Sequence, residues 1–280
     1  MKTKILIVLA VFVLTALLFY KKPEQVAEHS ESKPDIEIRQ IEIKKEITPE
    51  FIRIPLIRTV NDENRIYNDV IGHSPDAPFG NNDGKSTNVH ETVHGINSYY
   101  RNKQHGKVNA LYCLNGNLAI IEEPNVTIDQ VSRQIPVSLR EYRYQLYLVE
   151  QKHDWNNRPL YLFDEWSAYI AGSSYNINNQ EDNQKWTDGV SGPLEFSIYS
   201  IYLAITIKKH DPYYYNNNQQ FKKFLIYNLK LSQEIYKKGC NLPQFKWEKQ
   251  EKLLENLKHN EDAKEIRKFI IEELDGIFLH

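Results

Sequence analysis

An almost unbroken apolar segment lies at the start of the chain. Residues 5–20 are apolar except for Thr15, and lysines flank the run on both sides. As a helix the run would be about 24 Å long, slightly shorter than a bilayer core of about 30 Å. A basic start followed by an apolar stretch is typical of a secretory signal. We therefore predict a signal peptide or an uncleaved signal anchor at 1–22, with the rest of the chain extracytoplasmic, either membrane-anchored or secreted.

Polar and charged positions follow this segment. Residues 23–50 are mostly polar, and we interpret them as a tether. Residues 51–57 alternate apolar and polar side chains, which predicts a strand, and Pro55 would place that strand at a sheet edge. Residues 61–85 are dense in Asn, Asp, Gly and Pro, so we predict a long loop there.

Helical periodicity first appears at 88–100, where apolar residues recur at i, i+4, i+7 and i+11. A β-hairpin is predicted next, because two short apolar runs, 108–113 and 117–122, flank Asn115-Gly116. Further helices are predicted at 137–152, 159–172, 193–209, 218–238, 245–258 and 262–275, with loops at 176–188 and 213–220. The pattern predicts a mainly helical α+β domain over 51–280, with a small β-sheet and a helical C-terminal part from about 190 to 280.

The helix at 88–100 carries the pattern H-E-x-x-H, with His90, Glu91 and His94. Residues i and i+4 lie one above the other on a helix, so both imidazoles can bind one ion. Zinc bound in this way lowers the pKa of a coordinated water to about 7. The adjacent glutamate can then take the proton of the attacking water as a general base. His90 and His94 are thus the candidate metal ligands and Glu91 the candidate catalytic base.

Two structural roles compete with this interpretation. The histidines could be a surface pair on an amphipathic helix. Alternatively, Asn88 could cap the helix while Glu91 reaches back to it in a capping box. Capping by Ser86 or Thr87 would leave Glu91 free for chemistry.

A catalytic zinc needs a third protein ligand and one open position. The sequence after His94 contains no third histidine at short range, so a glutamate on a later helix is the alternative. Glu165 is our candidate, because it lies in an otherwise apolar helical segment where an unpaired charge is costly. Ala168 and Gly172 on its face are small and would let the motif helix approach. The rival ligands are Asp164, Glu195, Glu122 and Glu123.

His90-Glu91-x-x-His94, followed by a helix with Asp164-Glu165, resembles the glutamate-zincin metallopeptidases, which include thermolysin-like and lethal-factor-like groups. The resemblance covers two helices, about a tenth of the chain. It implies a zincin-like catalytic core with a zinc-bound water, two histidine ligands and a glutamate ligand. The chain departs from the thermolysin pattern in the wide gap between His94 and Glu165. It also lacks an aspartate where that group orients its second histidine, so peptide specificity does not carry over.

Such an enzyme also needs a donor for the oxyanion that develops on the substrate. Tyr169, one turn after Glu165, is our candidate catalytic donor. Asn97, one turn after His94, is a candidate partner of the ligand shell. Other possible donors are Tyr161, His153, Arg158 and Tyr199.

Composition narrows the functional classes. The formal net charge is −2, so nothing indicates a nucleic-acid surface. The sequence leaves two alternatives for Cys113 and Cys240: a disulfide between them, or two separate thiols. We predict a zinc-dependent hydrolase that acts on a peptide or protein substrate. The alternative is a membrane-anchored envelope binding protein with a structural or inactive zinc site.

Overall fold

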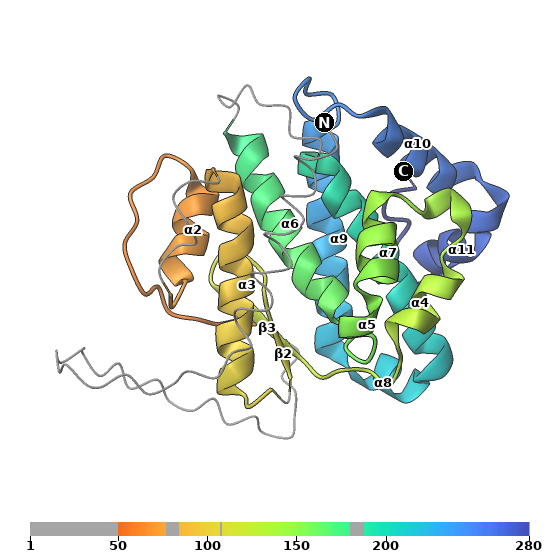
Figure 1. Ribbon diagram of the computed structural model, residues 1–280, viewed down its shortest axis with the longest axis horizontal. Helices are drawn as coiled ribbons and strands as arrows, with labels where there is room; N and C mark the ends of the chain where they lie inside the picture. The colour runs from red at the N-terminus through yellow and green to blue at the C-terminus, as the bar shows by residue number, and fades with distance from the viewer. Residues whose placement is uncertain (1–49, 77–83, 107, 180–187, 280) are drawn as a thin grey trace. The chain divides into compact units, whose positions relative to one another are not determined.

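The computed structural model describes residues 50–76, 84–106, 108–179 and 188–279. The predicted signal segment at 1–22 and all but the last residue of the predicted tether lie outside these residues. The described part is mainly helical with one small antiparallel sheet (Figure 1), so the predicted α+β class is confirmed.

The sheet has three strands: β1 (Ile52–Arg53), β2 (Asn109–Tyr112) and β3 (Asn117–Ile121). Their order is β1-β3-β2, so the strand predicted at 51–57 is indeed at an edge, although it is only two residues long. β2 and β3 form the predicted hairpin. Leu114, Asn115 and Gly116 turn the chain with positive φ values of 58°, 51° and 66°, which asparagine and glycine tolerate best.

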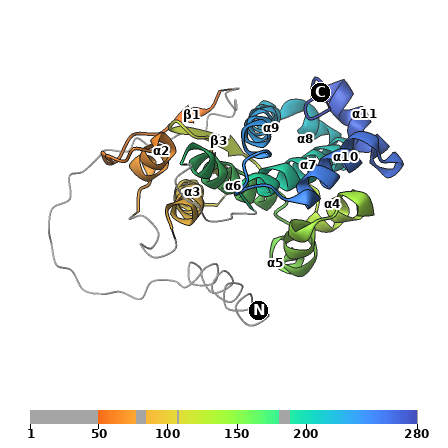
Figure 2. The ribbon, with the colours of Figure 1, turned by 90° about the horizontal axis from the view of Figure 1, so that it is seen from above.

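Four long helices form the body of the domain: α3 (Lys85–Lys103), α6 (Tyr161–Asn178), α7 (Asp188–His210) and α9 (Gln219–Gly239). Helix α3 packs against β2 on one side and α6 on another, and α6 also contacts α7 and α9. Figures 1 and 2 show α6 beside α3 in both views. The apolar stripe of α3 is fully buried, with Val89, Val93 and Ile96 inaccessible to solvent. The motif helix is therefore held rigidly against α6.

Shorter helical segments complete the described chain. They are α2 (Arg65–His73), α4 (Ile128–Gln134), η1 (Val137–Leu139), η2 (Tyr144–Glu150), α5 (Lys152–Trp155), α8 (Pro212–Asn217), α10 (Glu248–His259), η3 (Glu261–Ala263) and α11 (Lys264–Glu273). The predicted helices at 245–258 and 262–275 correspond to α10 and to η3 with α11.

The long loop predicted at 61–85 is wrong in part, because it contains α2 and the start of α3. The side chain of Asn64 caps α2 by accepting hydrogen bonds from the backbone N–H groups of Ile66 and Tyr67. Ile66 and Val70 then bury one face of the helix. The asparagine that indicated a loop is thus a helix cap, a position that asparagine favours.

The single helix predicted at 137–152 is also wrong. The backbone N–H of Arg143 donates to Glu195 Oε2 at 2.9 Å, and that of Glu141 faces the hydroxyl of Tyr199 at 3.4 Å. These tertiary partners replace helical carbonyls, so the segment divides into η1, the π-helix η2 and α5.

Three further boundaries differ from the prediction. Helix α6 continues to Asn178, past its predicted end at 172 and into the loop predicted at 176–188. Helix α8 occupies part of the loop predicted at 213–220, because Asp211 caps it by accepting from the N–H of Tyr214. Helix α7 begins at Asp188 rather than at Pro193, which lies within the helix. Proline lacks the N–H that would donate to the carbonyl of Gly189, so the helix continues through this position with one backbone hydrogen bond fewer.

Among the described residues, Gly189–His210 is the one helix long and apolar enough to cross a membrane, and the whole of its apolar window is buried inside the domain. This burial is typical of a core helix. Cys113 and Cys240 are both free thiols, so the possible disulfide is not formed.

Candidate metal centre

Helix α3 begins before the H-E-x-x-H pattern. Its N-cap is Gly84, with φ of 84°, and no side chain caps it. Asn88 lies inside the helix and is buried, so the capping box with Glu91 is wrong, as is capping by Ser86 or Thr87. Glu91 is therefore not used as a cap.

Small residues on α6 allow the motif helix to approach, as predicted. A Cβ atom added at Gly172 would lie 3.4 Å from the backbone oxygen of Ser86 and 3.5 Å from the Cβ of His90. These are ordinary van der Waals distances, so a side chain that extends beyond Cβ would push α3 away from α6. The close contact brings the histidines of α3 to the carboxylates of α6.

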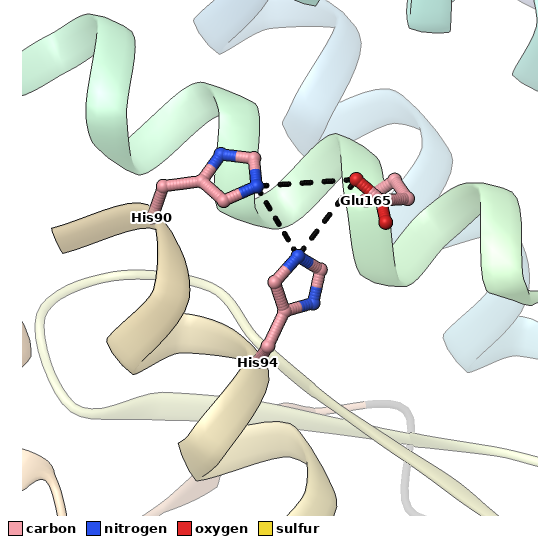
Figure 3. A group of neighbouring side chains, drawn as sticks. All are labelled: His90, His94 and Glu165. Atoms are coloured by element: carbon pink, nitrogen blue, oxygen red, sulfur yellow. Dashed lines mark hydrogen bonds and ion pairs between the residues drawn. The ribbon is translucent and has the colours of Figure 1, made fainter. Parts of the chain in front are cut away.

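The structure brings His90, His94 and Glu165 together (Figure 3). The Nε2 atoms of the two histidines are 3.2 Å apart. Glu165 Oε2 lies 3.9 Å from Nε2 of His90 and 3.7 Å from Nε2 of His94. Within the described chain, these three side chains form the one group of histidine, cysteine and acidic residues with ligand atoms close enough to share a metal ion.

The distance between the two histidine nitrogens is close to that of a tetrahedral site, and the glutamate oxygen lies a few tenths of an ångström farther out. Ligands at about 2.0–2.1 Å from a tetrahedral centre lie roughly 3.3–3.4 Å from one another. In addition, Glu165 Oε2 is buried and has no hydrogen-bond partner. A buried carboxylate oxygen without a partner is costly, and a cation between the three atoms removes this cost. The group could therefore hold a metal ion.

Asp164 does not join the ligand group but orients one of its members. Its Oδ1 accepts a hydrogen bond from Nδ1 of His94 at 2.6 Å, which leaves Nε2 of His94 directed at the site. Asn97 donates to the same oxygen at 3.0 Å. We did not expect an aspartate in this orienting role. As predicted, Asn97 lies next to the candidate ligands, but it hydrogen-bonds to Asp164 and not to a ligand.

Asn97 also connects the site to the sheet. Its Oδ1 accepts a hydrogen bond from the backbone N–H of Tyr112 in β2 at 2.8 Å, and its amide lies 3.2 Å from the hydroxyl of Ser167 in α6. One buried side chain thus fixes β2, α3 and α6 relative to one another, next to the candidate ligands.

Burial and neighbouring charges shift the pKa values of the site's side chains in opposite directions. Burial alone would lower the pKa of His94, but the carboxylates of Glu165 and Asp164 raise it to about 10. Burial and the neighbouring His94 hold the pKa of His90 well below its ordinary value. Burial raises the pKa of Glu165, while His94 and Tyr161 oppose this rise. The acidic groups thus provide an electrostatic environment that favours a cation among these side chains.

Glu91 lies beside the ligand group. It is partly exposed, and its charge raises the pKa of both His94 and Glu165. This position suits a base that must reach a water molecule next to the ligands.

Tyr169, the candidate oxyanion donor, packs against the first histidine. Its ring meets that of His90 edge-on with centroids 4.7 Å apart, and its hydroxyl lies 3.2 Å from that of Tyr147. The guanidinium of Arg143 covers its ring at 4.7 Å. A Cβ at Gly192 would lie 2.5 Å from the Tyr169 ring, so α7 needs glycine there.

The other candidate ligands and oxyanion donors lie outside the ligand group or make other contacts. Tyr161 donates to Glu165 Oε1 at 2.7 Å. Glu195 forms a buried ion pair with Arg143 and accepts from Tyr199, so neither Glu195 nor Tyr199 reaches the ligands. The rest lie outside the ligand group: His153 and Arg158, which are exposed, together with Glu122 and Glu123.

Comparison of the chain with models of protein families, with curated proteins and with solved structures finds no match. Its function must therefore be inferred from the geometry of these side chains.

The hydrogen bond between Asp164 and His94 leads to a prediction about metal affinity. Asp164→Asn keeps an oxygen acceptor but removes the charge that holds the imidazole. We expect zinc affinity, measured by competition with a chromophoric chelator, to fall about 10-fold or more, within the range of about 10–100-fold for such partners. Asp129→Asn is the matched control, because Asp129 is an ion-paired aspartate of α4. Equal affinity in both variants would contradict the orienting role.

Glu123 leads to a prediction about pH and stability. It accepts hydrogen bonds from Asn109 Nδ2 at 2.8 Å and from the N–H of Leu160 at 3.2 Å, and burial raises its pKa from 4.5 to about 7. The folded protein therefore binds this proton more tightly than the unfolded chain does. The resulting stability is complete below about pH 4.5 and is lost as the pH rises through about 7.

Urea unfolding of the wild type and Glu123→Gln measures this effect. The glutamine does not titrate, so we expect the free energy of unfolding of the wild type, relative to the variant, to fall by about 2–3 kcal/mol between pH 4.5 and 8. A flat difference would show that Glu123 is not protonated in the folded state.

Proposed function

We propose that this chain is a zinc-dependent hydrolase, a metallopeptidase that cleaves a peptide bond. His90, His94 and Glu165 hold the ion, and Glu91 is the general base. Tyr169 is the proposed oxyanion donor. One observation carries the proposal: the Nε2 atoms of the H-E-x-x-H histidines and Oε2 of a glutamate from a second helix lie 3.2–3.9 Å from one another, and this buried oxygen has no hydrogen-bond partner.

The donor set supports zinc over other common ions. Two imidazoles and one carboxylate are a ligand set of catalytic zinc, whereas calcium and magnesium prefer sites built of oxygens. Zinc, when bound, supplies Lewis-acid chemistry that acidifies water and polarises a carbonyl group. Three protein ligands would leave a position for water or substrate.

Three side chains have separate proposed roles in the reaction. Glu91 takes a proton from the attacking water and later delivers it to the leaving amine. Asp164 keeps His94 in one tautomer, with Nδ1 protonated and Nε2 available. Tyr169 donates its hydroxyl proton as a hydrogen bond to the oxygen that gains charge on the substrate carbonyl.

The experiment combines metal analysis with a search for cleavage. Purified full-length protein, loaded with zinc and freed of excess metal, is incubated with a proteome-derived peptide library, and new peptide ends are identified by mass spectrometry. We expect one zinc per chain and new ends with the wild type. Glu165→Ala is expected to lose the zinc and the cleavage together.

Stoichiometric zinc without any new peptide ends would contradict the proposed peptidase activity. It would favour an envelope binding protein with a structural or inactive zinc site. In either case the apolar segment at 1–22 supports a proposed location outside the cytoplasm, secreted or anchored to the membrane.

A further inference from the structure

The two oxygens of the Glu165 carboxylate lie in different environments. Its Oε2 faces the histidines and has no hydrogen-bond partner. Its Oε1 accepts a hydrogen bond from the hydroxyl of Tyr161, one turn earlier on α6, at 2.7 Å. The two oxygens of one ligand are therefore not equivalent.

Tyr161 is itself held in place from a separate segment. Its ring stacks on Trp155 of α5, with centroids 4.1 Å apart and planes 7° from parallel. Oε1 of Gln151 lies 3.3 Å from its hydroxyl as a second, more distant acceptor. Since the phenol has one proton and the contact with Glu165 is shorter, the hydroxyl donates to Glu165.

We propose that Tyr161 is a positioning residue that holds Oε1 of Glu165 away from the metal, so that the carboxylate binds through Oε2 alone. The inference rests on the proposed metal site. A second bond from Oε1 would occupy the position that a catalytic centre leaves open. The hydrogen bond from Tyr161 thus keeps this position accessible and also fixes the ligand, as partners of metal ligands commonly do.

Tyr161 and Tyr169 have different surroundings. The hydroxyl of Tyr161 donates to a candidate ligand at 2.7 Å, closer than its contact with Gln151 Oε1 at 3.3 Å. The hydroxyl of Tyr169 meets another tyrosine, Tyr147, and its ring borders His90. Because the single proton of Tyr161 is already donated to Glu165, this residue acts through its neighbour rather than on the substrate.

The test compares Tyr161→Phe with Tyr144→Phe, which removes a hydroxyl that donates to the Ser132 carbonyl instead. Zinc affinity is measured by chelator competition, and Co²⁺-loaded proteins are compared by visible absorption. We expect zinc affinity to fall about 10–100-fold in Tyr161→Phe only. We also expect a weaker cobalt spectrum in that variant, because a bidentate Glu165 raises the coordination number. Gln151→Ala removes the competing acceptor and keeps the hydroxyl, so we expect its affinity and spectrum to match those of the wild type.

The outcomes separate this inference from the proposed function. If the wild type binds neither zinc nor cobalt, the metal centre itself is wrong and the inference fails with it. If the wild type binds both and Tyr161→Phe matches it in affinity and spectrum, the positioning role alone is overturned. Reduced cleavage by Tyr161→Phe with unchanged affinity and spectrum would instead place the hydroxyl on the substrate, which also overturns the proposal.

Discussion

Replacing Glu91 by glutamine is expected to lower kcat for peptide cleavage by about 10²–10⁴-fold while the zinc content stays at one ion per chain. Glutamine has nearly the same size and helix propensity, but it cannot take a proton from water. The ligand atoms belong to His90, His94 and Glu165, so the variant is expected to retain the metal. The measurement is the initial rate of cleavage of a peptide found in the library experiment, with zinc determined on the same sample.

Glu234→Gln is the control for this variant, because Glu234 is an exposed glutamate paired with Lys238 on α9. We expect its kcat to equal that of the wild type. If Glu91→Gln were as active as this control, Glu91 would not be the base. If it lost the zinc, the ligand set would have to include Glu91.

The second large effect is on stability. Glu195→Ala is expected to lower the free energy of unfolding by about 3–5 kcal/mol, because it leaves the charge of Arg143 buried without its counter-ion. The side chains of Glu195 and Arg143 are 0% and 1% exposed, and Arg143 Nη1 lies 2.6 Å from Glu195 Oε1. Glu195 also accepts from the N–H of Arg143 and from the hydroxyl of Tyr199. Urea denaturation measures the change.

Two comparisons make this second prediction specific. The exposed pair between Lys268 and Glu272 is the control, and Glu272→Ala is expected to cost about 0–1 kcal/mol. The double variant Arg143→Met/Glu195→Gln removes both charges, so it is expected to recover much of the loss. A double variant less stable than Glu195→Ala alone would contradict the claim that the unpaired charge causes the destabilisation.

Much of the candidate site could be predicted from the sequence because it depends on local spacing. Two histidines four residues apart lie on one helical face whatever surrounds them. Glu165 could be singled out because it is a carboxylate in an apolar segment, and the structure places it with the histidines. The hairpin could be predicted because Asn115-Gly116 suits a turn with positive φ.

What the sequence did not reveal depends on contacts between distant residues. Asp164 precedes the candidate ligand directly, but its role requires His94, which is 70 positions away. The break in the helix predicted at 137–152 follows from Glu195, which accepts the N–H of Arg143 across 52 positions. The bond from Tyr161 to Glu165 is the exception. It spans one helical turn, and the i, i+4 spacing of a donor and a carboxylate could have indicated it.

The most direct test of the metal centre is the position of zinc in a crystal of the zinc-loaded protein, found by anomalous scattering at the zinc edge. We predict a single peak about 2.0–2.2 Å from Nε2 of His90, Nε2 of His94 and Oε2 of Glu165. Oε1 of Glu165 is predicted to lie farther from the ion and to accept a hydrogen bond from the Tyr161 hydroxyl. A peak bound by other residues, or no peak at this group in protein that contains stoichiometric zinc, would contradict the account.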